Sequence, residues 1–439
     1  MQRIEQIAIW IKDIENKMKP ILILSIFITT ALLGCSTNNK TYNNHLSQSL
    51  EDWLGKPISD REALEDLAFS KEPLTKPEIK YNTALLFQDK QKQMKNDFEN
   101  QWNAREIEYN GIKMPFYYNK FGDAPSDGRS LFISLHGGGG TQANVNDQQY
   151  ENQKHLYDHT MSTLEGIYLA PRAPTDTWNL WHQDHIDDLL NIIIQMSIAL
   201  ENVNPNKIYL LGYSAGGDGV YQLAPRMADR WAAAAMMAGH PNETSPLGLK
   251  NTPFAVHVGA HDDAYDRNLK AKEWKTMLDD LEKNAPGTYL HSVKLHEGLG
   301  HWMNHEDAVA LPWMKNYYRN PIPEKIVWKQ DDRHHNRFYW LGVPEDLIET
   351  GGEVIVEYNN LRNEINILSN YSNVLELYIN DKMLNLDEPV TIKYQGETIA
   401  QKTIKRSLLN SYNTLSIKGD AELSFPGVIR VINNETVQE

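Results

Sequence analysis

Leu-Gly-Tyr-Ser-Ala-Gly-Gly-Asp-Gly, residues 211–219, contains the pattern Gly-x-Ser-x-Gly centred on Ser214. The run at 207–211 is short, apolar and rich in β-forming residues, so it predicts a buried strand, and the small residues after Ser214 favour a helix packed close to it. A serine between a strand and a helix lies on a sharp turn, where neighbouring glycines relieve the crowding that a Cβ would cause. We therefore expect Ser214 to present an exposed hydroxyl at a helix N-terminus, where the helix dipole favours developing negative charge.

A second glycine-rich segment, His-Gly-Gly-Gly-Gly at 136–140, directly follows the apolar strand predicted at 131–135. A serine that attacks a carbonyl carbon creates an oxyanion, which needs backbone N–H donors at close range. His-Gly-Gly-Gly is the loop described for lipases and esterases, where it acts together with the residue after the nucleophile. We expect the backbone amides of Gly138, Gly139 and Ala215 to form this oxyanion hole. A flexible glycine linker is the alternative, and the position directly after a strand argues against it.

An acid and a base are predicted downstream of Ser214. The apolar run 254–258 leads to Asp262, and the run 290–295 leads to His301. Both candidates lie just past the carboxyl end of a predicted strand, which is the edge where ligands bind in open α/β sheets. The chain order of serine, aspartate and histidine is that of the α/β-hydrolases.

These residue types suit nucleophilic catalysis. A serine hydroxyl is a poor nucleophile until a base removes its proton, and His301 is the predicted base and later the acid that protonates the leaving group. Asp262 is predicted to hold the imidazole in the useful tautomer and to stabilise the imidazolium. Asp263 is the alternative acid, and Asp266 is a weaker candidate because it lies four residues further on.

Other histidines offer alternative bases. His257 lies inside an apolar strand, which indicates a hydrogen-bonded core residue, whereas His240 follows another strand and could line the site. His296, His334 and His335 are predicted to be surface positions.

Together these motifs resemble the α/β-hydrolase superfamily, and within it the branch of esterases and polyhydroxybutyrate-depolymerase-like enzymes that includes secreted carbohydrate esterases. The resemblance extends over about residues 106–320 and is carried by 212–216, 136–140, 259–262 and 300–301. The Gly-x-x-Asp of 259–262 resembles the family pattern, which favours Asp262 as the acid. The resemblance implies a serine hydrolase, but it does not define the substrate because the superfamily hosts many chemistries.

Strand and helix patterns alternate through this region. Residues 107–121 alternate and contain Asn110-Gly111, a strong hairpin signal, so this segment is predicted to begin the sheet. Later strands are predicted at 131–135, 166–170, 208–211, 232–237, 254–258 and 290–295, and helices lie between most of them, for example at 187–201 and 269–283. This alternation predicts an α/β fold: a mostly parallel sheet with helices on both faces.

The sequence pattern changes near Asn-Pro-Ile-Pro at 320–323. Alternating segments separated by turn residues follow, so residues 321–439 are predicted to form a small antiparallel β-sandwich. This domain is either a carbohydrate-binding module or, as we favour, a packing domain that shapes one wall of the cleft. The aromatic run at 338–341 could be a binding platform, although aromatic residues in a strand are more often part of a core.

The N-terminal region predicts export. An apolar run at 21–33 ends in Leu-Leu-Gly-Cys, which resembles a bacterial lipobox and makes Cys35 the expected lipidation site. Residues 1–35 are then a lipoprotein signal peptide, with translation possibly starting at Met18. An ordinary secretory peptide or an N-terminal anchor helix is the alternative. By family analogy, the serine after Cys35 favours the outer membrane of a Gram-negative bacterium. Residues 36–105 are predicted to be a tether followed by surface helices.

Composition excludes several classes of protein. The 439 residues carry a formal net charge of −15, which argues against nucleic acid or anionic lipid headgroups as partners. We expect no cofactor and no metal, and a lipid anchor is the predicted membrane contact.

His301 and His305 have one-face helical spacing but lack the glutamate of a zinc-protease motif, and no carboxylate pair accompanies His182 and His185.

The loop after the strand at 166–170 is the predicted substrate wall. Trp178, Trp181 and His182 lie on a polar, proline-stiffened segment that would suit stacking on a sugar ring or an aromatic acyl group. Trp181 could instead anchor the following helix. Residues 146–150 could form a second polar wall or simply a solvated helix start. A long apolar lid is not evident in the sequence, which argues against a true lipase.

These features predict a serine carboxylic-ester hydrolase that acts through an acyl-serine intermediate on acylated carbohydrate or related esters at the cell envelope. A serine peptidase on the same fold and a non-catalytic surface binding protein are the alternatives.

Overall fold

The computed structural model describes residues 44–438. Residues 49–438 belong to one compact unit. The predicted signal peptide, Met18 and the lipidation site Cys35 lie outside the described residues, as does most of the predicted tether.

Two helices precede the central sheet: α2 (Asn44–Leu54) and α3 (Lys76–Ala104). The start of α3 is fixed by a capping box, in which Glu78 accepts hydrogen bonds from the backbone N–H and the hydroxyl of Thr75 at 2.8 and 2.7 Å. α3 ends at Arg105, which adopts the left-handed conformation. Within residues 44–438, no helix combines the length and the apolar character that crossing a membrane requires.

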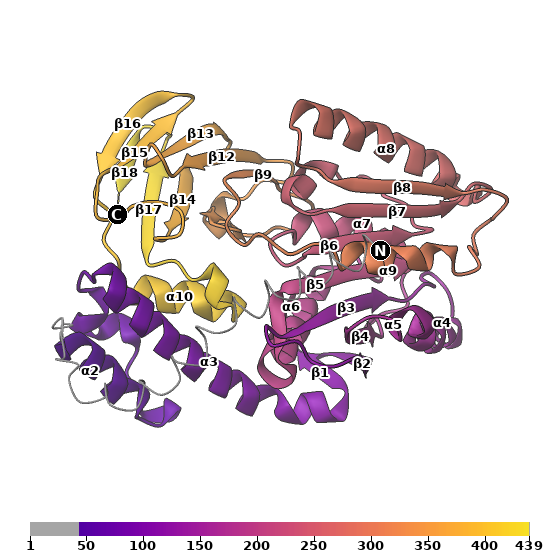
Figure 1. The fold of residues 1–439 in the computed structure, drawn as a ribbon, viewed down its shortest axis with the longest axis horizontal. Coiled ribbons are helices and arrows are strands. Elements are labelled where there is room, and N and C mark those ends of the chain that lie inside the picture. Colours follow the sequence, from indigo (N-terminus) through magenta and orange to yellow (C-terminus); the bar gives the residue numbers. More distant parts are fainter. Residues whose placement is uncertain (1–43, 439) are drawn as a thin grey trace, which may run out of the picture. The chain divides into compact units, whose positions relative to one another are not determined.

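Eight strands form the central sheet (Figure 1). Their bounds are Glu106–Tyr109 (β1), Ile112–Phe121 (β2), Arg129–Leu135 (β3), Gly166–Pro171 (β4), Val203–Tyr213 (β5), Ala233–Met237 (β6), Phe254–Gly259 (β7) and His291–His296 (β8). They are ordered β1-β2-β4-β3-β5-β6-β7-β8. β1 and β2 form a hairpin at Asn110-Gly111, β2 runs antiparallel to β4, and all pairs from β4 to β8 are parallel.

Helices cover both faces of this sheet. They are α4 (Ala143–His155), α5 (Asp158–Met161), α6 (Asp184–Glu201), α7 (Ala215–Arg226), α8 (Arg267–Asn284) and α9 (Ala310–Met314). Side chains alternate along each strand: Ile208 and Leu210 of β5 join the core that contains α6, α7 and α8, whereas Tyr209 and Leu211 join the core that contains α5 and α9. The strand order and the two covered faces confirm the predicted fold class, the α/β-hydrolase fold.

A β-sandwich follows, and it confirms the second part of the predicted fold class. Its strands are Lys325–Lys329 (β9), Arg337–Phe338 (β10), Leu341–Gly342 (β11), Glu353–Asn359 (β12), Glu364–Asn370 (β13), Val374–Ile379 (β14), Val390–Tyr394 (β15), Glu397–Lys402 (β16), Gly427–Ile432 (β17) and Thr436–Gln438 (β18). They form two five-stranded sheets, β10-β11-β14-β17-β18 and β16-β15-β13-β12-β9. The pairing is antiparallel except between β13 and β15, which run parallel. Phe338 and Trp340 are buried in this core, so the aromatic run is not a binding platform.

Short 3-10 helices complete the chain. They lie at Ile58–Asp60 (η1), Leu64–Asp66 (η2), Ala68–Lys71 (η3), Pro246–Asn251 (η4), Ala264–Asp266 (η5), Glu306–Val309 (η6), Glu345–Leu347 (η7) and Ala421–Leu423 (η8). One helix of the sandwich region, α10 (Leu408–Lys418), has no counterpart among the predicted elements. Ser407 caps its start by accepting a hydrogen bond from the N–H of Asn410 at 3.3 Å, and Gly419 ends it in the left-handed conformation.

Buried ion pairs join the sandwich region to the hydrolase region. Arg319 donates to Asp420 at 2.6 Å, and Lys418 contacts Asp229 at 3.0 Å. The Tyr339 hydroxyl donates to the carbonyl of Ala228 at 2.8 Å. Breaking one partner of such a pair would leave a charge buried without compensation. The domain boundaries at 105 and 320 remain predictions from the sequence.

Candidate active site

The turn between β5 and α7 carries Ser214. This residue has φ 59° and ψ −122°, a conformation that is strained for a side chain with a Cβ. A Cβ at Gly216 would collide with the carbonyl of Leu135, and a Cβ at Gly212 would collide with the carbonyl of Gly216. Only glycine fits these two positions, and β5 and α7 can therefore approach closely enough to hold Ser214 at the carboxyl edge of the sheet.

The structure brings Ser214, His301 and Asp262 together. His301 Nε2 lies 3.0 Å from Ser214 Oγ, and His301 Nδ1 lies 2.8 Å from Asp262 Oδ2. Because the carboxylate accepts the Nδ1 proton, Nε2 of the neutral ring is free to accept the proton of the serine hydroxyl. The side chains converge although 87 residues separate Ser214 from His301 in the chain.

The carboxylate of Asp262 is fixed from two sides. The residue is only 2% exposed, and its other oxygen, Oδ1, lies 3.5 Å from the guanidinium of Arg267. The alternative acids, Asp263 and Asp266, are both exposed. Among the described residues, Asp262 is the carboxylate that contacts His301.

Tyr213, the residue before Ser214, holds the loop that carries His301. Its hydroxyl donates to the carbonyl of His301 at 2.7 Å and accepts from the N–H of Met303 at 3.0 Å. Burial raises the pKa of Tyr213, so the phenol stays protonated and able to donate. The sequence analysis missed this positioning residue, because the contact joins two segments that are 88 residues apart.

The predicted oxyanion hole needs one correction. Ala215 occupies the first position of α7, where helix N–H groups have no intrahelical partner. Gly138 lines the same cleft as Ser214. The N–H of Gly139, however, donates to the side chain of Asn146 at 2.8 Å, so it is already engaged. The amides of Ala215 and Gly138 are therefore the donors that the geometry leaves to an oxyanion, and the buried Asn146 holds the loop in place.

His136 fixes the direction of the Gly138 amide. Its Nε2 accepts a hydrogen bond from the N–H of Ala173 at 3.0 Å, so the proton is on Nδ1, which donates to the carbonyl of Gly137 at 2.6 Å. The C=O and the following N–H of a trans peptide point in opposite directions. The Gly138 N–H therefore points away from the His136 ring. Burial lowers the pKa of His136 to about 4, which keeps this arrangement neutral.

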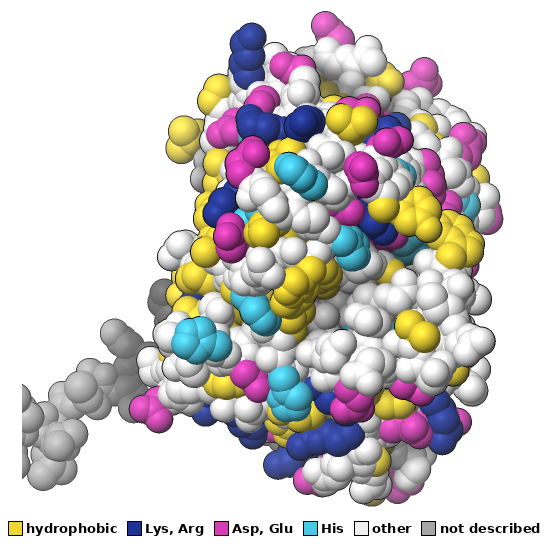
Figure 2. All heavy atoms as spheres, turned by 90° about the vertical axis from the view of Figure 1, so that its right-hand side faces the viewer, with side chains coloured by type: hydrophobic (Ala, Val, Ile, Leu, Met, Phe, Trp, Pro, Cys, Tyr) yellow, Lys and Arg dark blue, Asp and Glu magenta, His cyan; other side chains and the backbone are white. Residues whose placement is uncertain are grey.

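A cleft of about 810 Å³ opens beside Ser214. α4 lines the cleft with Val145, Gln149 and Asn152, and the loop after His301 lines it with Trp302. The Trp302 ring is 48% exposed and packs edge-on to His305, with ring centroids 4.9 Å apart. Figure 2 shows the molecule from the side at which the arrows of β7 and β8 end in Figure 1, and histidine and hydrophobic side chains gather in the middle of this face. Gln149 belongs to the segment predicted as a second polar wall.

The predicted substrate residues lie outside this cleft. Trp181 is fully buried, and its indole N–H donates to the carbonyl of His136 at 2.8 Å, so it supports the glycine loop and cannot stack on a substrate. Trp178 is 63% exposed but lies beside Gly140 rather than among the cleft residues. His182 packs against Trp178, and burial lowers its pKa to about 4. Trp302, which the sequence analysis did not select, is the indole that faces the cleft.

Two buried histidines, His257 and His296, form a hydrogen-bonded pair. His257 is buried as predicted, and its Nδ1 lies 3.1 Å from Nε2 of His296. His296 was predicted at the surface, which is wrong: it is 1% exposed, and its Nδ1 lies 3.0 Å from the carboxylate of Glu306. Since Nδ1 of His296 donates to Glu306, its Nε2 accepts the proton of His257 Nδ1. His240 bonds to Asn242 and is partly exposed, and it is not a residue of the cleft.

Acid should destabilise the protein through His257. Burial, followed by the proximity of His296, lowers the pKa of His257 from 6.5 to about 3. Below pH 6.5 His257 binds a proton in the unfolded chain, whereas in the folded protein it binds one only below about pH 3. The free energy of unfolding therefore falls as the pH falls from 6.5 to 3. Between pH 7.5 and 5.0 we expect the wild type to lose about 2 kcal/mol more unfolding free energy than His257→Gln, by urea denaturation. His159→Gln, at an exposed histidine, is the control and should keep the wild-type pH dependence.

The geometry of His301 and His305 does not match the helical spacing that was considered for a metal site. His301 and His305 lie in a loop with His305 at φ 64°, so they do not share a helix face. Across residues 44–438, no cluster of three or more His, Cys, Asp or Glu side chains is arranged to hold a metal ion.

Comparisons with known proteins find likenesses among solved structures. No protein-family model and no curated protein matches the chain. A thermostable esterase is 18% identical with a TM-score of 0.40, over 49% of this chain and 62% of its own length, so less than two thirds of that esterase is covered. A ferulic acid esterase is 16% identical with a TM-score of 0.34, over 48% of this chain and 96% of its own length. Esterase 2 of Thermogutta terrifontis is 14% identical with a TM-score of 0.34, over 48% and 89%.

Proposed function

We propose that this chain is a serine carboxylic-ester hydrolase that acts through an acyl-serine intermediate. The observation that carries the proposal is the continuous hydrogen-bonded series from Ser214 Oγ through His301 to Asp262, at the edge of an open cleft. A base within 3.0 Å of a hydroxyl, itself oriented by a buried carboxylate, is the arrangement that activates a serine for attack.

Each step of the reaction has a group to perform it. Ser214 Oγ attacks the ester carbonyl while His301 Nε2 takes its proton, and Asp262 stabilises the imidazolium. The oxyanion of the tetrahedral intermediate accepts hydrogen bonds from the amides of Ala215 and Gly138. The intermediate then breaks its bond to the leaving alkoxide oxygen, which takes the proton from His301 and departs as the alcohol, and the acyl group remains on Ser214. Water repeats the sequence and releases the carboxylic acid.

Covalent labelling tests this proposal directly. A fluorophosphonate probe should phosphonylate Ser214 stoichiometrically, and peptide mass spectrometry should locate the adduct there. His301→Ala, which removes the base, should label far more slowly. An unlabelled wild-type protein, or a label on another serine, would show that the Ser214 hydroxyl is not activated.

We further propose that the substrates are acylated carbohydrates or related esters. The cleft combines an exposed indole, Trp302, with polar side chains of Gln149, Asn152 and His305. Such a wall suits a ligand with one flat apolar face and several hydroxyl groups. A location at the cell envelope, with a lipid anchor at Cys35 and without nucleic-acid partners, completes the proposal, and sequence features alone support it.

Trp302 should determine affinity for large substrates rather than the rate of chemistry. Trp302→Ala is expected to raise KM for a feruloylated or acetylated oligosaccharide about tenfold while kcat changes little, because a stacking contact is lost and the triad is retained. Trp178→Ala is the matched control and should leave KM unchanged. Steady-state kinetics measure both, and a larger effect at Trp178 would place the substrate on the other side of the glycine loop.

A further inference from the structure

The turn that follows Asp262 carries a largely buried arginine. Arg267 Nη1 lies 3.5 Å from Oδ1 of Asp262, which is the carboxylate oxygen that does not contact His301. The side chain of Arg267 is 11% exposed and that of Asp262 is 1% exposed. Among the residues that the structure describes, Arg267 is the lysine or arginine that pairs with this carboxylate. Because a guanidinium does not lose its proton in proteins, the buried negative charge has a permanent cation beside it.

Arg267 occupies its position against the local preferences of the chain. It is the first residue of α8, where the helix dipole disfavours a cation, and the first turn of α8 contains no acidic residue. Tyr265 and Asp266 before it have φ values of 58° and 57°, which are strained for residues with a Cβ. Asp266 also makes no capping hydrogen bond with its side chain. Such departures indicate that a requirement outside the helix determines this turn.

Contacts within the turn hold the guanidinium against Asp262. The N–H of Asn268 donates to the carbonyl of Asp262 at 3.0 Å, and the side-chain amide of Asn268 donates to the carbonyl of Ala260 at 2.9 Å. The guanidinium carbon of Arg267 lies 4.9 Å from the centroid of the Tyr265 ring. The start of α8 and the loop of Asp262 are therefore joined, and the ring of Tyr265 packs on the guanidinium.

A second carboxylate in this region adds to the negative charge near His301. Asp218, in the first turn of α7, accepts a hydrogen bond from the N–H of His240 at 2.6 Å. Burial raises the pKa of Asp218, and the His240 N–H and the charges of Arg267 and His301 act against burial. The phenol of Tyr213 stays neutral, because burial raises its pKa. Arg267 is thus a cation that offsets both carboxylates.

We propose that Arg267 is a positioning residue of the triad, an inference that rests on the proposed esterase function. While His301 is neutral, the guanidinium compensates the buried charge of Asp262. In its absence, an imidazolium at His301 would be the cation left to stabilise that carboxylate, so His301 would keep its proton to higher pH. A protonated His301 cannot accept the proton of Ser214 Oγ. Arg267 therefore allows the base to work near neutral pH.

The pH dependence of kcat/KM for p-nitrophenyl acetate tests this role. Arg267→Met should move the acidic midpoint of the profile to higher pH by about one pH unit. At alkaline pH, where the base is unprotonated in both proteins, turnover by this variant should approach that of the wild type. Arg267→Lys keeps the positive charge and should bring the midpoint back toward that of the wild type.

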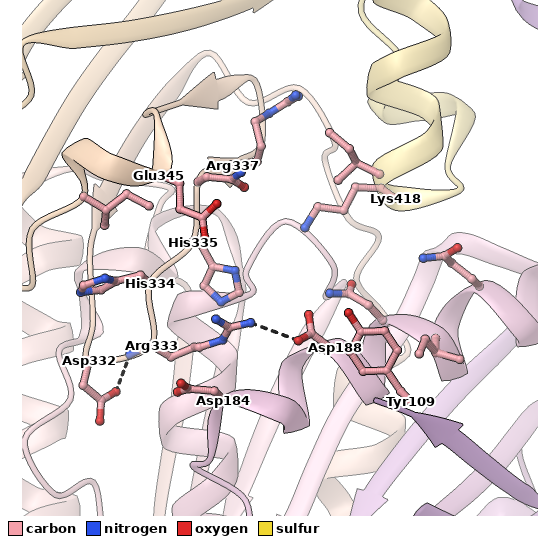
Figure 3. A pocket seen from close by; sticks show the side chains of 16 residues that line it. Tyr109, Asp184, Asp188, Asp332, Arg333, His334, His335, Arg337, Glu345 and Lys418 are labelled. Atoms are coloured by element: carbon pink, nitrogen blue, oxygen red, sulfur yellow. Dashed lines mark hydrogen bonds and ion pairs between the residues drawn. The ribbon is translucent and has the colours of Figure 1, made fainter. Parts of the chain in front are cut away.

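Arg333→Met is the matched control. Arg333 contacts Asp188 at 3.2 Å, in a cavity of about 550 Å³ that shares no described lining residue with the Ser214 cleft (Figure 3). The substitution removes the same charge from another ion pair with an aspartate. It should leave the midpoint of the profile unchanged, because the charge it removes lies far from the triad.

Two results would overturn the proposal. The first is a wild-type midpoint in Arg267→Met, which would show that the charge does not act on the base. The second is a loss of activity by the same factor at every pH, which would show that Arg267 only supports the fold. If thermal melting shows that Arg267→Met is unfolded, Arg267→Gln takes its place with the same expected result. Failure of the proposed function is distinct, since the wild type itself would then neither hydrolyse the ester nor react with a fluorophosphonate at Ser214.

Discussion

Ser214→Ala is expected to lower kcat for p-nitrophenyl acetate by about 10⁴-fold or more, because it removes the atom that forms the acyl intermediate. The hydroxyl contributes little to folding: Ser214 is at the cleft surface, and its backbone N–H donates to the carbonyl of Met237 at 2.9 Å whatever the side chain. The melting temperature should therefore stay close to that of the wild type.

The control for this experiment is Ser162→Ala. Ser162 is exposed, and its hydroxyl donates only to the neighbouring carbonyl of His159 at 2.6 Å, so its removal should leave turnover unchanged. Substantial activity in Ser214→Ala would mean that another group hydrolyses the ester and that the proposed function is wrong.

Asp262→Asn should reduce kcat by about 10³- to 10⁴-fold. The substitution preserves shape, but an amide that donates toward His301 Nδ1 would favour the tautomer with its proton on Nε2, where the ring can no longer accept the serine proton. Arg267, 3.5 Å from the native carboxylate, would also lose its charged partner, so a modest loss of stability should accompany the kinetic defect.

Asp263→Asn is the matched substitution one residue away. Asp263 is exposed, whereas Asp262 is buried, so this variant should retain activity near that of the wild type. A reversal of the two results, measured by the pH dependence of kcat/KM, would assign the acid to Asp263.

The fold was predictable because its signals are local. Apolar runs of strand length alternate with helical patterns, and the strands β3 to β8 lie where those runs are. The glycines around Ser214 reflect close approaches of backbone to backbone, which are visible in sequence as residues without a Cβ. α10 was missed because Leu408–Lys418 is rich in Asn, Ser and Thr, which are weak helix formers, and a cap at Ser407 and the packing of Leu408 and Leu415 stabilise it instead.

The walls of the cleft were harder to predict because they depend on burial. Trp178, Trp181 and Trp302 are the same residue type in the sequence, yet Trp178 is exposed away from the cleft, Trp181 is in the core and Trp302 lines the cleft beside Ser214. The loss of Gly139 as a free donor has the same origin, since Asn146 reaches it from the first turns of α4. Such outcomes follow from how loops pack, and periodicity does not report this packing.

The hydrogen bonds of Tyr213 have a consequence for how this scaffold could diversify. The hydroxyl of Tyr213, the residue before Ser214, forms hydrogen bonds to the backbone on both sides of Trp302, at the carbonyl of His301 and the N–H of Met303. If the proposed function holds, replacement of the indole, or remodelling of the α4 wall, can therefore alter which substrates are accepted without disturbing the alignment of Ser214 and His301. New specificities could arise here by single mutations, with the chemical machinery inherited intact.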